Sequence, residues 1–299
     1  MAAMSAGSTV VTYPDGAVEG RARVLDVVPL GGERVGVVTD VTPFHPLDHA
    51  WPDQPADVGE LRAGGTVHPV VDCVTAARPV DDGPARVAAP YIGGDVPVPR
   101  GASGWTWLVM HVLPAPGPAA GDAVELRVDA ERRAALCAGH TACHLVALAL
   151  NAALAGRWRK ETRADSLGHP DFDGLAITSS HIHEDGSTDR YRVGKSLRKK
   201  GFTADGLDAA LPEIAARVNE RLAGWAATGA PVTIDRDGPL LTDRRHWTCA
   251  LPEGRAVLAC GGTHLRNVAQ LAELTCALSL SADGTALTAH TKAVRTLRV

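Results

Sequence analysis

The stretch ERRAALCAGHTACHLVALALNAALA, from Glu131 to Ala155, divides this sequence into two parts of different character. It is rich in Ala and Leu, has no Pro and contains Gly139 as its one glycine, so we expect a helix over its length. The sequence before it predicts strands, and the sequence after it mixes strands with a further helix. Because 299 residues suffice for two domains, we expect one over residues 1–129 and another over 130–299.

The first part shows Val-rich segments separated by turns that contain Pro and Gly. Several short strands with frequent turns are typical of a small β-barrel or sandwich, and a barrel-like domain is our expectation. The Pro- and Gly-rich stretch 79–103 is expected to be a surface excursion. The expected strands cover residues 18–28, 34–41, 66–74, 105–113 and 123–128.

The second part predicts an α+β domain. A helix is expected over 211–227, because apolar residues from Leu211 to Trp225 recur every three or four positions. Strand-like segments occur at 175–183, 188–193, 255–260 and 274–280, without the regular alternation of a parallel sheet. The predicted fold class is therefore α+β, with a small N-terminal β-barrel domain followed by an α+β domain.

Composition narrows the classes of function. Hydrophobic residues make up 45% and charged residues 21%, as in globular proteins. The formal net charge of -4 excludes coating of nucleic acid by bulk charge, and 4% aromatic residues argue against an extended base-stacking surface. Without a run of about 18 apolar residues we expect no membrane span. The N-terminus lacks the pattern of a secretion signal and six cysteines are too few for a disulfide scaffold, so we expect a cytoplasmic protein.

Two pairs of residues suggest a metal site. His140 and His144 are four residues apart in the expected helix, so both imidazoles lie on one face. Far downstream, Cys260 and His264 flank two glycines and Thr263, and the glycines allow a tight turn. Three imidazoles and one thiolate form a ligand set that Zn²⁺ accepts.

Each pair alone has a simpler interpretation. In a chain with 12 histidines some pairs arise by chance, and His181 with His183 on one face of an expected strand is an example. Cys143, beside the first pair, has the character of a small core residue. The remaining cysteines have no partner pattern and are interpreted as structural: Cys73, Cys137, Cys249 and Cys276.

A basic strip is a candidate for binding phosphates. Residues 190–200 hold six basic residues and no acid: Arg190, Arg192, Lys195, Arg198, Lys199 and Lys200. Such a concentration on an acidic chain indicates contacts with a nucleic-acid backbone, and the alternative is a solvated basic loop. A second cluster follows the metal helix: Arg157, Arg159, Lys160 and Arg163.

The segments HTACH (140–144) and CGGTH (260–264) resemble the editing domain of alanyl-tRNA synthetase and the freestanding AlaX-type alanyl-tRNA editing proteins. Further similar segments follow in family order, among them VTPF (41–44), QPADVG (54–59), GDAV (121–124) and VN (218–219), so the resemblance runs from about residue 39 to 270. The chain departs from the family between His45 and Gln54, where the family has a shorter loop with a Gly-Gly-Gln turn.

The resemblance implies a trans-acting deacylase that hydrolyses the ester of a mischarged aminoacyl-tRNA at a zinc site. Family precedent suggests Ser or Gly on alanine tRNA. The editing region of threonyl-tRNA synthetase has a related metal-helix pattern, so with the altered loop the resemblance also suggests a threonine analogue, such as fluorothreonine, on threonine tRNA. Zinc either activates water or holds the substrate. Thr263 and the amide of Gly262 are candidate oxyanion donors, and His45 and His49 are further candidate catalytic residues in the altered loop.

Two other classes of function remain open. A non-catalytic tRNA-binding module with a structural zinc fits the same four ligands, because four protein ligands fill a tetrahedral site. A metal hydrolase for a small ester or amide would not need the basic strip.

Overall fold

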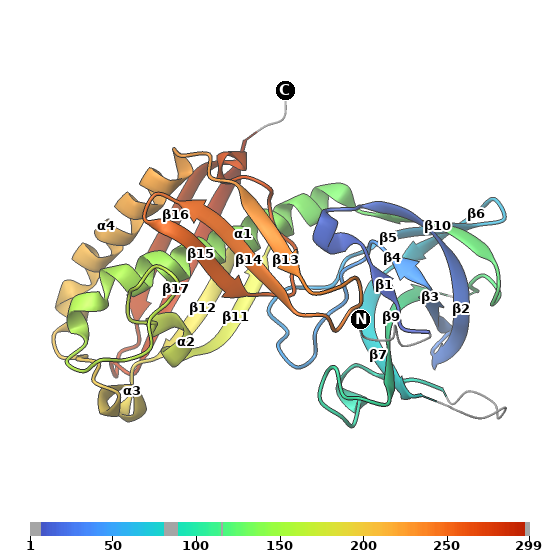
Figure 1. Ribbon diagram of the computed structural model, residues 1–299, viewed down its shortest axis with the longest axis horizontal. Coiled ribbons are helices and arrows are strands. Elements are labelled where there is room, and N and C mark those ends of the chain that lie inside the picture. The colour runs from blue at the N-terminus through green and yellow to red at the C-terminus, as the bar shows by residue number, and fades with distance from the viewer. Residues whose placement is uncertain (1–6, 81–88, 115, 297–299) are drawn as a thin grey trace. The chain divides into compact units, whose positions relative to one another are not determined.

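The chain forms two compact units in the computed structural model, which describes residues 7–80, 89–114 and 116–296 (Figure 1). Unit 1 comprises Met1–Arg133, Arg236–Arg245 and Gly261–Thr263. Unit 2 comprises Ala134–Asp235, His246–Cys260 and His264–Val299. Two short later segments therefore belong to the same unit as the N-terminal part of the chain.

Unit 1 is built on one eight-stranded sheet whose strand order is β6-β5-β10-β2-β3-β9-β7-β8, with neighbours antiparallel. A parallel pair, β1 and β4, lies outside this sheet. The elements are β1 Val10–Val11, η1 Tyr13–Asp15, β2 Glu19–Gly31, β3 Arg34–Thr39, β4 Val41–Thr42, β5 Gly59–Ala63, β6 Thr66–Val70, β7 Asp72–Pro79, β8 Tyr91–Ile92, η2 Gly93–Asp95, β9 Trp105–Pro114 and β10 Ala123–Val128.

The long strand β2 belongs to both halves of this sheet. Its first half pairs with β10, and its second half pairs with β3 after a register shift between Val24 and Asp26. Side chains from both halves meet in one core, where Leu61 of β5 and Leu126 of β10 pack with Leu113 of β9. Burying these side chains is the main stabilisation of unit 1.

The strands of unit 1 do not form the closed barrel that the sequence suggested. The strand order has two ends, β6 and β8, whereas closure requires every strand to pair on both sides. β6 contains Pro69, which has no amide hydrogen for a further ladder. The chain after β6 makes a backbone bond from Val71 N to Val112 O of β9, and β8 is two residues long.

Unit 2 contains two antiparallel sheets, in the orders β11-β12-β17-β16 and β13-β14-β15. Its mixture of helices with antiparallel strands confirms the predicted α+β class. Its elements, with α1 starting just before the unit, are α1 Ala130–Ala153, η3 Ala155–Arg157, α2 Phe172–Ala176, β11 Ile177–His183, β12 Gly186–Arg192, α3 Lys195–Lys199, α4 Leu207–Ala226, β13 Val232–Arg236, β14 Arg245–Leu251, β15 Gly254–Ala259, η4 Val268–Gln270, β16 Leu271–Leu280 and β17 Ala286–Arg295.

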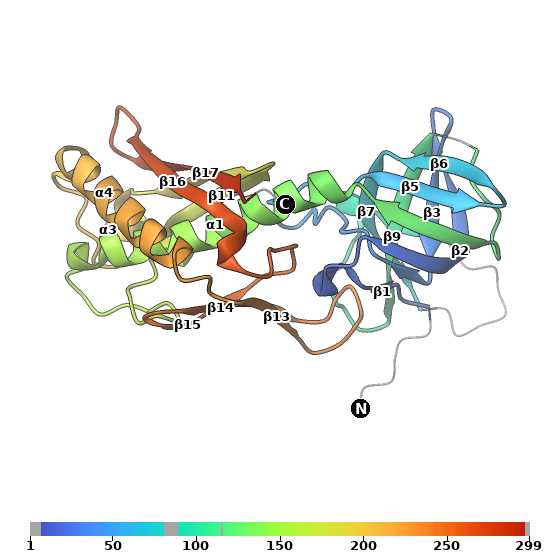
Figure 2. The same ribbon diagram turned by 90° about the horizontal axis from the view of Figure 1, so that it is seen from above.

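Helix α1 passes between the two sheets of unit 2 (Figure 2). On one side Gly139 lies so close to the β11–β12 hairpin that a Cβ atom there would be 2.4 Å from the carbonyl oxygen of His183. On the other side the ring of His144 lies 5.2 Å from that of Trp247 in β14. By length and composition α1 is apolar enough to cross a membrane, but 89% of the relevant window is buried inside the protein.

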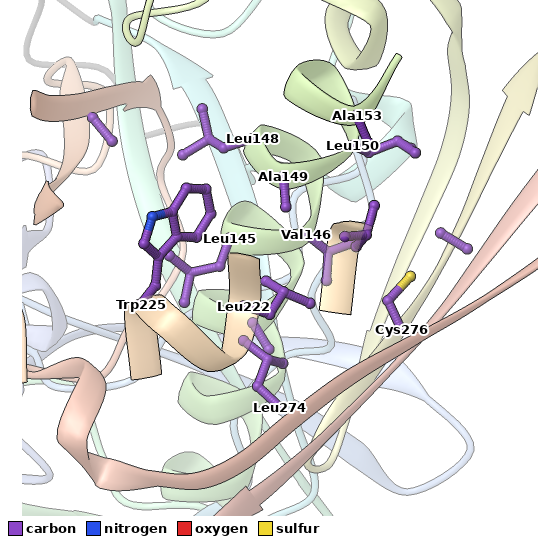
Figure 3. Packing of buried hydrophobic residues seen from close by; sticks show 14 of the residues in the cluster. Leu145, Val146, Leu148, Ala149, Leu150, Ala153, Leu222, Trp225, Leu274 and Cys276 are labelled. Atoms are coloured by element: carbon purple, nitrogen blue, oxygen red, sulfur yellow. The ribbon is translucent and has the colours of Figure 1, made fainter. Parts of the chain in front are cut away.

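The core of unit 2 is shared by α1, α4 and β16 (Figure 3). Leu145 and Ala149 of α1 lie near Leu222 and Trp225 of α4, and Leu274 of β16 completes the contact. Asn219 of α4 ties this layer together, because its side chain donates to the carbonyl of Cys276 and accepts from the Cys276 amide at 2.9 and 2.8 Å.

Most expected elements are present with shifted ends. The helix expected over 131–155 is α1, whereas α4 begins at Leu207 and includes Pro212, earlier than the expected start at 211. The strand expected over 66–74 is two strands, β6 and β7, and β5, β13, β14 and β17 were not expected. Of the expected excursion 79–103, residues 81–88 lie outside the described residues, and the rest includes β8 and η2.

Candidate metal centre

The two helical histidines lie on one face of α1, as their spacing predicted. The ring centroids of His140 and His144 are 4.8 Å apart. His140 is 1% exposed, and the whole segment belongs to a helix held between two sheets. These two imidazoles are therefore fixed by regular structure before any ligand binds.

The other two residues come from the chain that follows β15. Cys260 stands directly after the strand, and His264 follows the two glycines and Thr263. The Cys260 Sγ atom is 3.4 Å from His140 Nε2 and 3.2 Å from His264 Nε2. The ring of His264 lies 4.3 Å from that of His140 and 5.0 Å from that of His144. All four side chains thus converge on one point in unit 2.

This arrangement fits a divalent metal ion. One ligand atom from each of His140, His144, Cys260 and His264 lies within 4.8 Å of all the others. With the usual zinc bond lengths, a sulfur and a nitrogen on a tetrahedral ion are about 3.5 Å apart, close to the observed separations. The four residues can therefore hold a metal ion, and the ligand types are those that Zn²⁺ accepts.

His144 offers a nitrogen atom that no protein group satisfies among the described residues. This atom, Nε2, is buried. Burial lowers the pKa of His144 to about 4, so its ring is neutral at physiological pH. A buried neutral imidazole nitrogen without a partner is costly unless a metal or another donor satisfies it.

Thr141 lies beside the ring nitrogen of His264 that does not face Cys260. Its buried hydroxyl accepts a hydrogen bond from the Leu265 amide at 3.0 Å and lies 3.4 Å from His264 Nδ1. When Nδ1–H donates to this oxygen, the Nε2 lone pair of His264 remains available for a metal. The role of Thr141 was not predicted from the sequence, although its position between His140 and His144 on one helix was a usable signal.

The proposed oxyanion donors have defined surroundings in unit 1. The Thr263 amide donates to Gln54 Oε1 at 3.0 Å, and Gln54 Nε2 donates to the Thr263 hydroxyl oxygen at 2.9 Å. Thr263 is 2% exposed, and Gly262 is also buried. The Thr263 amide is therefore already engaged, while its hydroxyl can still donate a hydrogen. Gln54, which the sequence analysis noted within a similar segment only, fixes this residue.

The two loop histidines belong to unit 1, whereas the four metal-binding candidates belong to unit 2. His45 is buried, its ring packs edge-on against Tyr13 at 5.0 Å, and burial lowers its pKa to about 4. His49 is exposed and lies against Gly93. The surroundings of His45 favour a packing role.

The basic strip divides into two parts. Arg190 and Arg192 are exposed residues of β12, whereas Lys195, Arg198, Lys199 and Lys200 are exposed on or directly after α3. Arg159 and Lys160 lie beside the α3 part, because the Arg159 amide donates to Gly201 O at 2.9 Å and Trp158 packs on Phe202. The α3 basic group is therefore Lys195, Arg198, Lys199, Lys200, Arg159 and Lys160.

The other two basic residues of the second cluster have partners in unit 2. Arg157 donates to the carbonyl oxygens of Thr203 and Asp205, each at 3.2 Å, and Arg163 pairs with Asp171 at 2.8 Å. The structure therefore brings part of the second cluster to the α3 group and uses the rest to hold loops.

A buried polar cluster that the sequence did not indicate lies beside α1. Asp189 of β12 accepts from the hydroxyls of Ser180 and Ser187 at 2.6 and 2.7 Å and from the Cys143 thiol at 3.4 Å. Burial raises the pKa of Asp189 and, well above its usual range, that of Cys143. Cys143 therefore remains a thiol that donates into the cluster. His181 and His183 are exposed on β11 and do not belong to the four-residue group.

Comparison with known proteins relates the chain to part of alanine--tRNA ligase. The ligase from Caldivirga maquilingensis is 33% identical over 130 residues, which cover 44% of this chain and 10% of the relative. The ligase from Parafrankia sp. is 32% identical over 161 residues (52% and 14%), and that from Anaeromyxobacter dehalogenans 29% over 245 residues (81% and 21%). The matches thus span about a tenth to a fifth of the length of these relatives. No family model matches the chain.

Proposed function

We propose that this protein is a trans-acting aminoacyl-tRNA hydrolase of the editing type, acting in the cytoplasm. The observation that carries the proposal is the convergence of His140, His144, Cys260 and His264 from two distant segments. Similarity to alanine--tRNA ligases, together with the resemblance of both segments to the editing region, supports tRNA as the partner. The α3 basic group supplies exposed cations for its phosphates.

We propose zinc as the metal. When bound, it would supply Lewis-acid polarisation of the ester carbonyl or a water of lowered pKa. The chain contributes a rigid donor set, because α1 fixes two imidazoles and Thr141 orients a third. It also contributes a site that Trp247, which is fully buried, shields on one side.

The developing oxyanion would be met by donors around the glycine turn. Thr263 directly precedes the ligand His264 in the chain, and Gln54 holds its hydroxyl oxygen and amide in place. The Thr263 hydroxyl hydrogen is then available to donate to the oxyanion. We propose the Gly262 amide as the second donor. Preorganised donors of this kind stabilise the transition state without reorganising during the reaction. His49 remains a predicted contributor from the altered loop.

For the substrate, Ser or Gly esterified to alanine tRNA is favoured by the similarity to alanine--tRNA ligases. A threonine analogue such as fluorothreonine on threonine tRNA is the second proposal, because the loop from His45 to Gln54 departs from the family. The ester linkage and the hydrolysis are the same in both cases.

A second function is supported by the number of ligands. Four protein side chains are enough to fill a tetrahedral zinc ion, as in structural sites, whereas catalytic sites keep a position open. A tRNA-binding module with a structural zinc is therefore the competing proposal.

Hydrolysis of mischarged tRNA separates the two. The purified protein is loaded with zinc and incubated with Ser- and Gly-charged alanine tRNA and with analogue-charged threonine tRNA, while released amino acid is measured. We expect about one zinc per chain and turnover of at least one substrate. Loss of both is expected in His140→Ala and Cys260→Ala, but not in His169→Ala, which removes a partly exposed histidine outside the group. Zinc binding without turnover of any charged tRNA would reject the enzyme and leave the binding module.

A further inference from the structure

The four-stranded sheet of unit 2 has one covered and one uncovered face. Ile182, Tyr191 and Ala289 are buried on the covered side, where Tyr191 and Ala289 belong to the core that includes residues of α1 and α4. Alternate residues on the same strands are exposed, among them His181, Arg190 and His290. Because successive side chains of a strand point to opposite faces, the exposed residues share the second face. We call it the open face; its cationic and titratable members are His181, His183, Arg190, Arg192, His290 and Lys292.

Strand register arranges these residues in rows. His181 of β11 lies opposite Thr188 of β12, which lies opposite His290 of β17. The Thr188 hydroxyl is 3.4 Å from His290 Nδ1. In the next row Ser179, Arg190, Thr288 and Ser279 follow one another across all four strands. Strands are about 4.8 Å apart and residues two positions along a strand about 6.6 Å apart, so polar groups recur at these intervals.

The charge on this face is predominantly positive. Among the residues of β11, β12, β16 and β17 that the structure describes, the acids are Asp189, which is buried on the covered side, and Glu273, which is exposed on the open face two residues from Thr275, the partner of Lys292. Glu184 and Asp185 lie in the turn between β11 and β12, where Asp185 pairs with Arg295. An ordinary solvated sheet face carries charges of both signs. Within its strands this face carries Arg190, Arg192 and Lys292 against one acid, Glu273, on a chain whose net charge is -4.

The open face also continues into the α3 basic group. Strand β12 carries Arg190 and Arg192 and leads through Val193 and Gly194 directly into α3, whose first residue is Lys195. The basic strip of the sequence is thus the seam between a sheet face and a helix. A surface that comprises the open face and α3 is larger than the basic strip of residues 190–200. It also includes residues of β11 and β17, which the sequence pattern did not connect with the strip.

We propose that the open face binds the sugar-phosphate backbone of the tRNA. The arginines and Lys292 would contact phosphates, while the hydroxyl groups of Thr188 and Thr288 and the imidazole of His290 would face the 2′-hydroxyls that distinguish RNA from DNA. This rests on the proposed function, and it assigns a second contact surface away from the four metal ligands. An acidic protein as the occupant is the outcome that the test below separates.

The test compares two triple variants that remove the same charge. The open-face variant is Arg190→Ala, Arg192→Ala and Lys292→Ala. The control is Arg21→Ala, Arg62→Ala and Arg127→Ala, three exposed residues of unit 1 with acidic partners of their own. Binding of fluorescein-labelled, uncharged alanine tRNA transcript is followed by anisotropy across a series of salt concentrations. Zinc content and far-UV circular dichroism report whether each variant is folded.

The open-face variant should weaken tRNA binding about tenfold or more, with the salt slope falling by roughly 0.7–0.9 for each phosphate that the variant no longer neutralises. The control should keep the wild-type dissociation constant and slope. Thr188→Ala with His290→Ala, which changes no permanent charge, should reduce the preference for RNA over a DNA oligonucleotide of the same sequence.

A folded open-face variant with wild-type affinity and slope would overturn the proposal while leaving the proposed function intact, provided that wild-type protein hydrolyses charged tRNA. Wild-type protein that neither binds nor hydrolyses tRNA would overturn both, and the open face would then suit an acidic protein partner.

Discussion

Replacing Gly139 by Ala tests whether close packing of α1 on the β11–β12 hairpin holds unit 2 together. A Cβ atom at this position would lie 2.4 Å from His183 O, 2.5 Å from Gly186 O and 2.9 Å from Gly186 N. All three are backbone atoms, so no side chain can rotate away. Ordinary contact begins at 3.4 Å, and the helix and hairpin must therefore separate by about 1 Å.

The magnitude follows from two opposing effects. Ala in place of Gly stabilises a helix interior by about 0.8–1.0 kcal/mol. Overpacking a filled core costs about 1–3 kcal/mol, and a backbone displacement of this size falls at the upper end. We expect a net destabilisation of about 1–2 kcal/mol. Because His140 is the next residue, the displaced helix should also bind zinc more weakly.

Gly224→Ala is the matched control. Gly224 lies in α4, is exposed, and a Cβ atom there would meet nothing within 4 Å. This variant should be as stable as wild type or more stable, by up to about 1 kcal/mol. Urea unfolding of both variants, with zinc affinity from chelator competition, gives the comparison. If Gly139→Ala raised stability as Gly224→Ala does, the inferred packing of α1 on the hairpin would be wrong.

Three further outcomes are expected. Arg133→Met leaves Asp57 charged and buried, since the side chains of Arg133 and Asp57 are 4% and 1% exposed, and it should lower the free energy of unfolding in urea by about 3–5 kcal/mol. Arg21→Met, which breaks an exposed pair with Glu125, should lower it by at most about 1 kcal/mol, and equal losses would contradict the role of burial. Thr141→Val should lower zinc affinity about tenfold to a hundredfold in chelator competition, with Thr141→Ser restoring it; unchanged affinity would show that the hydroxyl does not orient His264. Burial lowers the pKa of His45 and of His111, both in unit 1, from 6.5 to about 4, so between these pH values the unfolded chain binds protons that the folded unit does not; the stability of the protein should therefore fall as the pH drops from about 6.5 towards 4. Equal melting temperatures at pH 7 and pH 5 would refute this expectation.

The sequence predicted best those features that depend on one short segment of the chain. The spacing of His140 and His144 needs no knowledge of the fold, because 3.6 residues per turn place them on one face of any helix. The absence of Pro and the many Ala and Leu residues likewise predicted α1 nearly to its ends. Gly139 is unfavourable in a helix interior by propensity alone, and the hairpin whose close approach requires it is about 45 residues further along the chain.

The pairing of strands that are far apart in the sequence could not be predicted from local patterns. Whether the strands of unit 1 close into a barrel depends on which edges meet, and Pro69 at one edge was readable as a local signal, whereas the strand order was not. The strip from Arg190 to Lys200 reads as one feature in sequence, but only the structure shows that Arg190 and Arg192 lie on the open face of the sheet while its other four basic residues lie on or directly after α3.

Local hydrogen bonding and side-chain periodicity therefore determined, from sequence alone, the helix that carries His140 and His144, the mixed fold class and both halves of the candidate ligand set. Tertiary structure alone decided that Cys260 and His264 reach the two helical histidines, that Thr141 lies behind His264, and that residues of four strands share one open face. The physical reason is that neighbouring residues fix a helix or a strand, while the meeting of distant segments depends on how whole elements bury their apolar faces against one another.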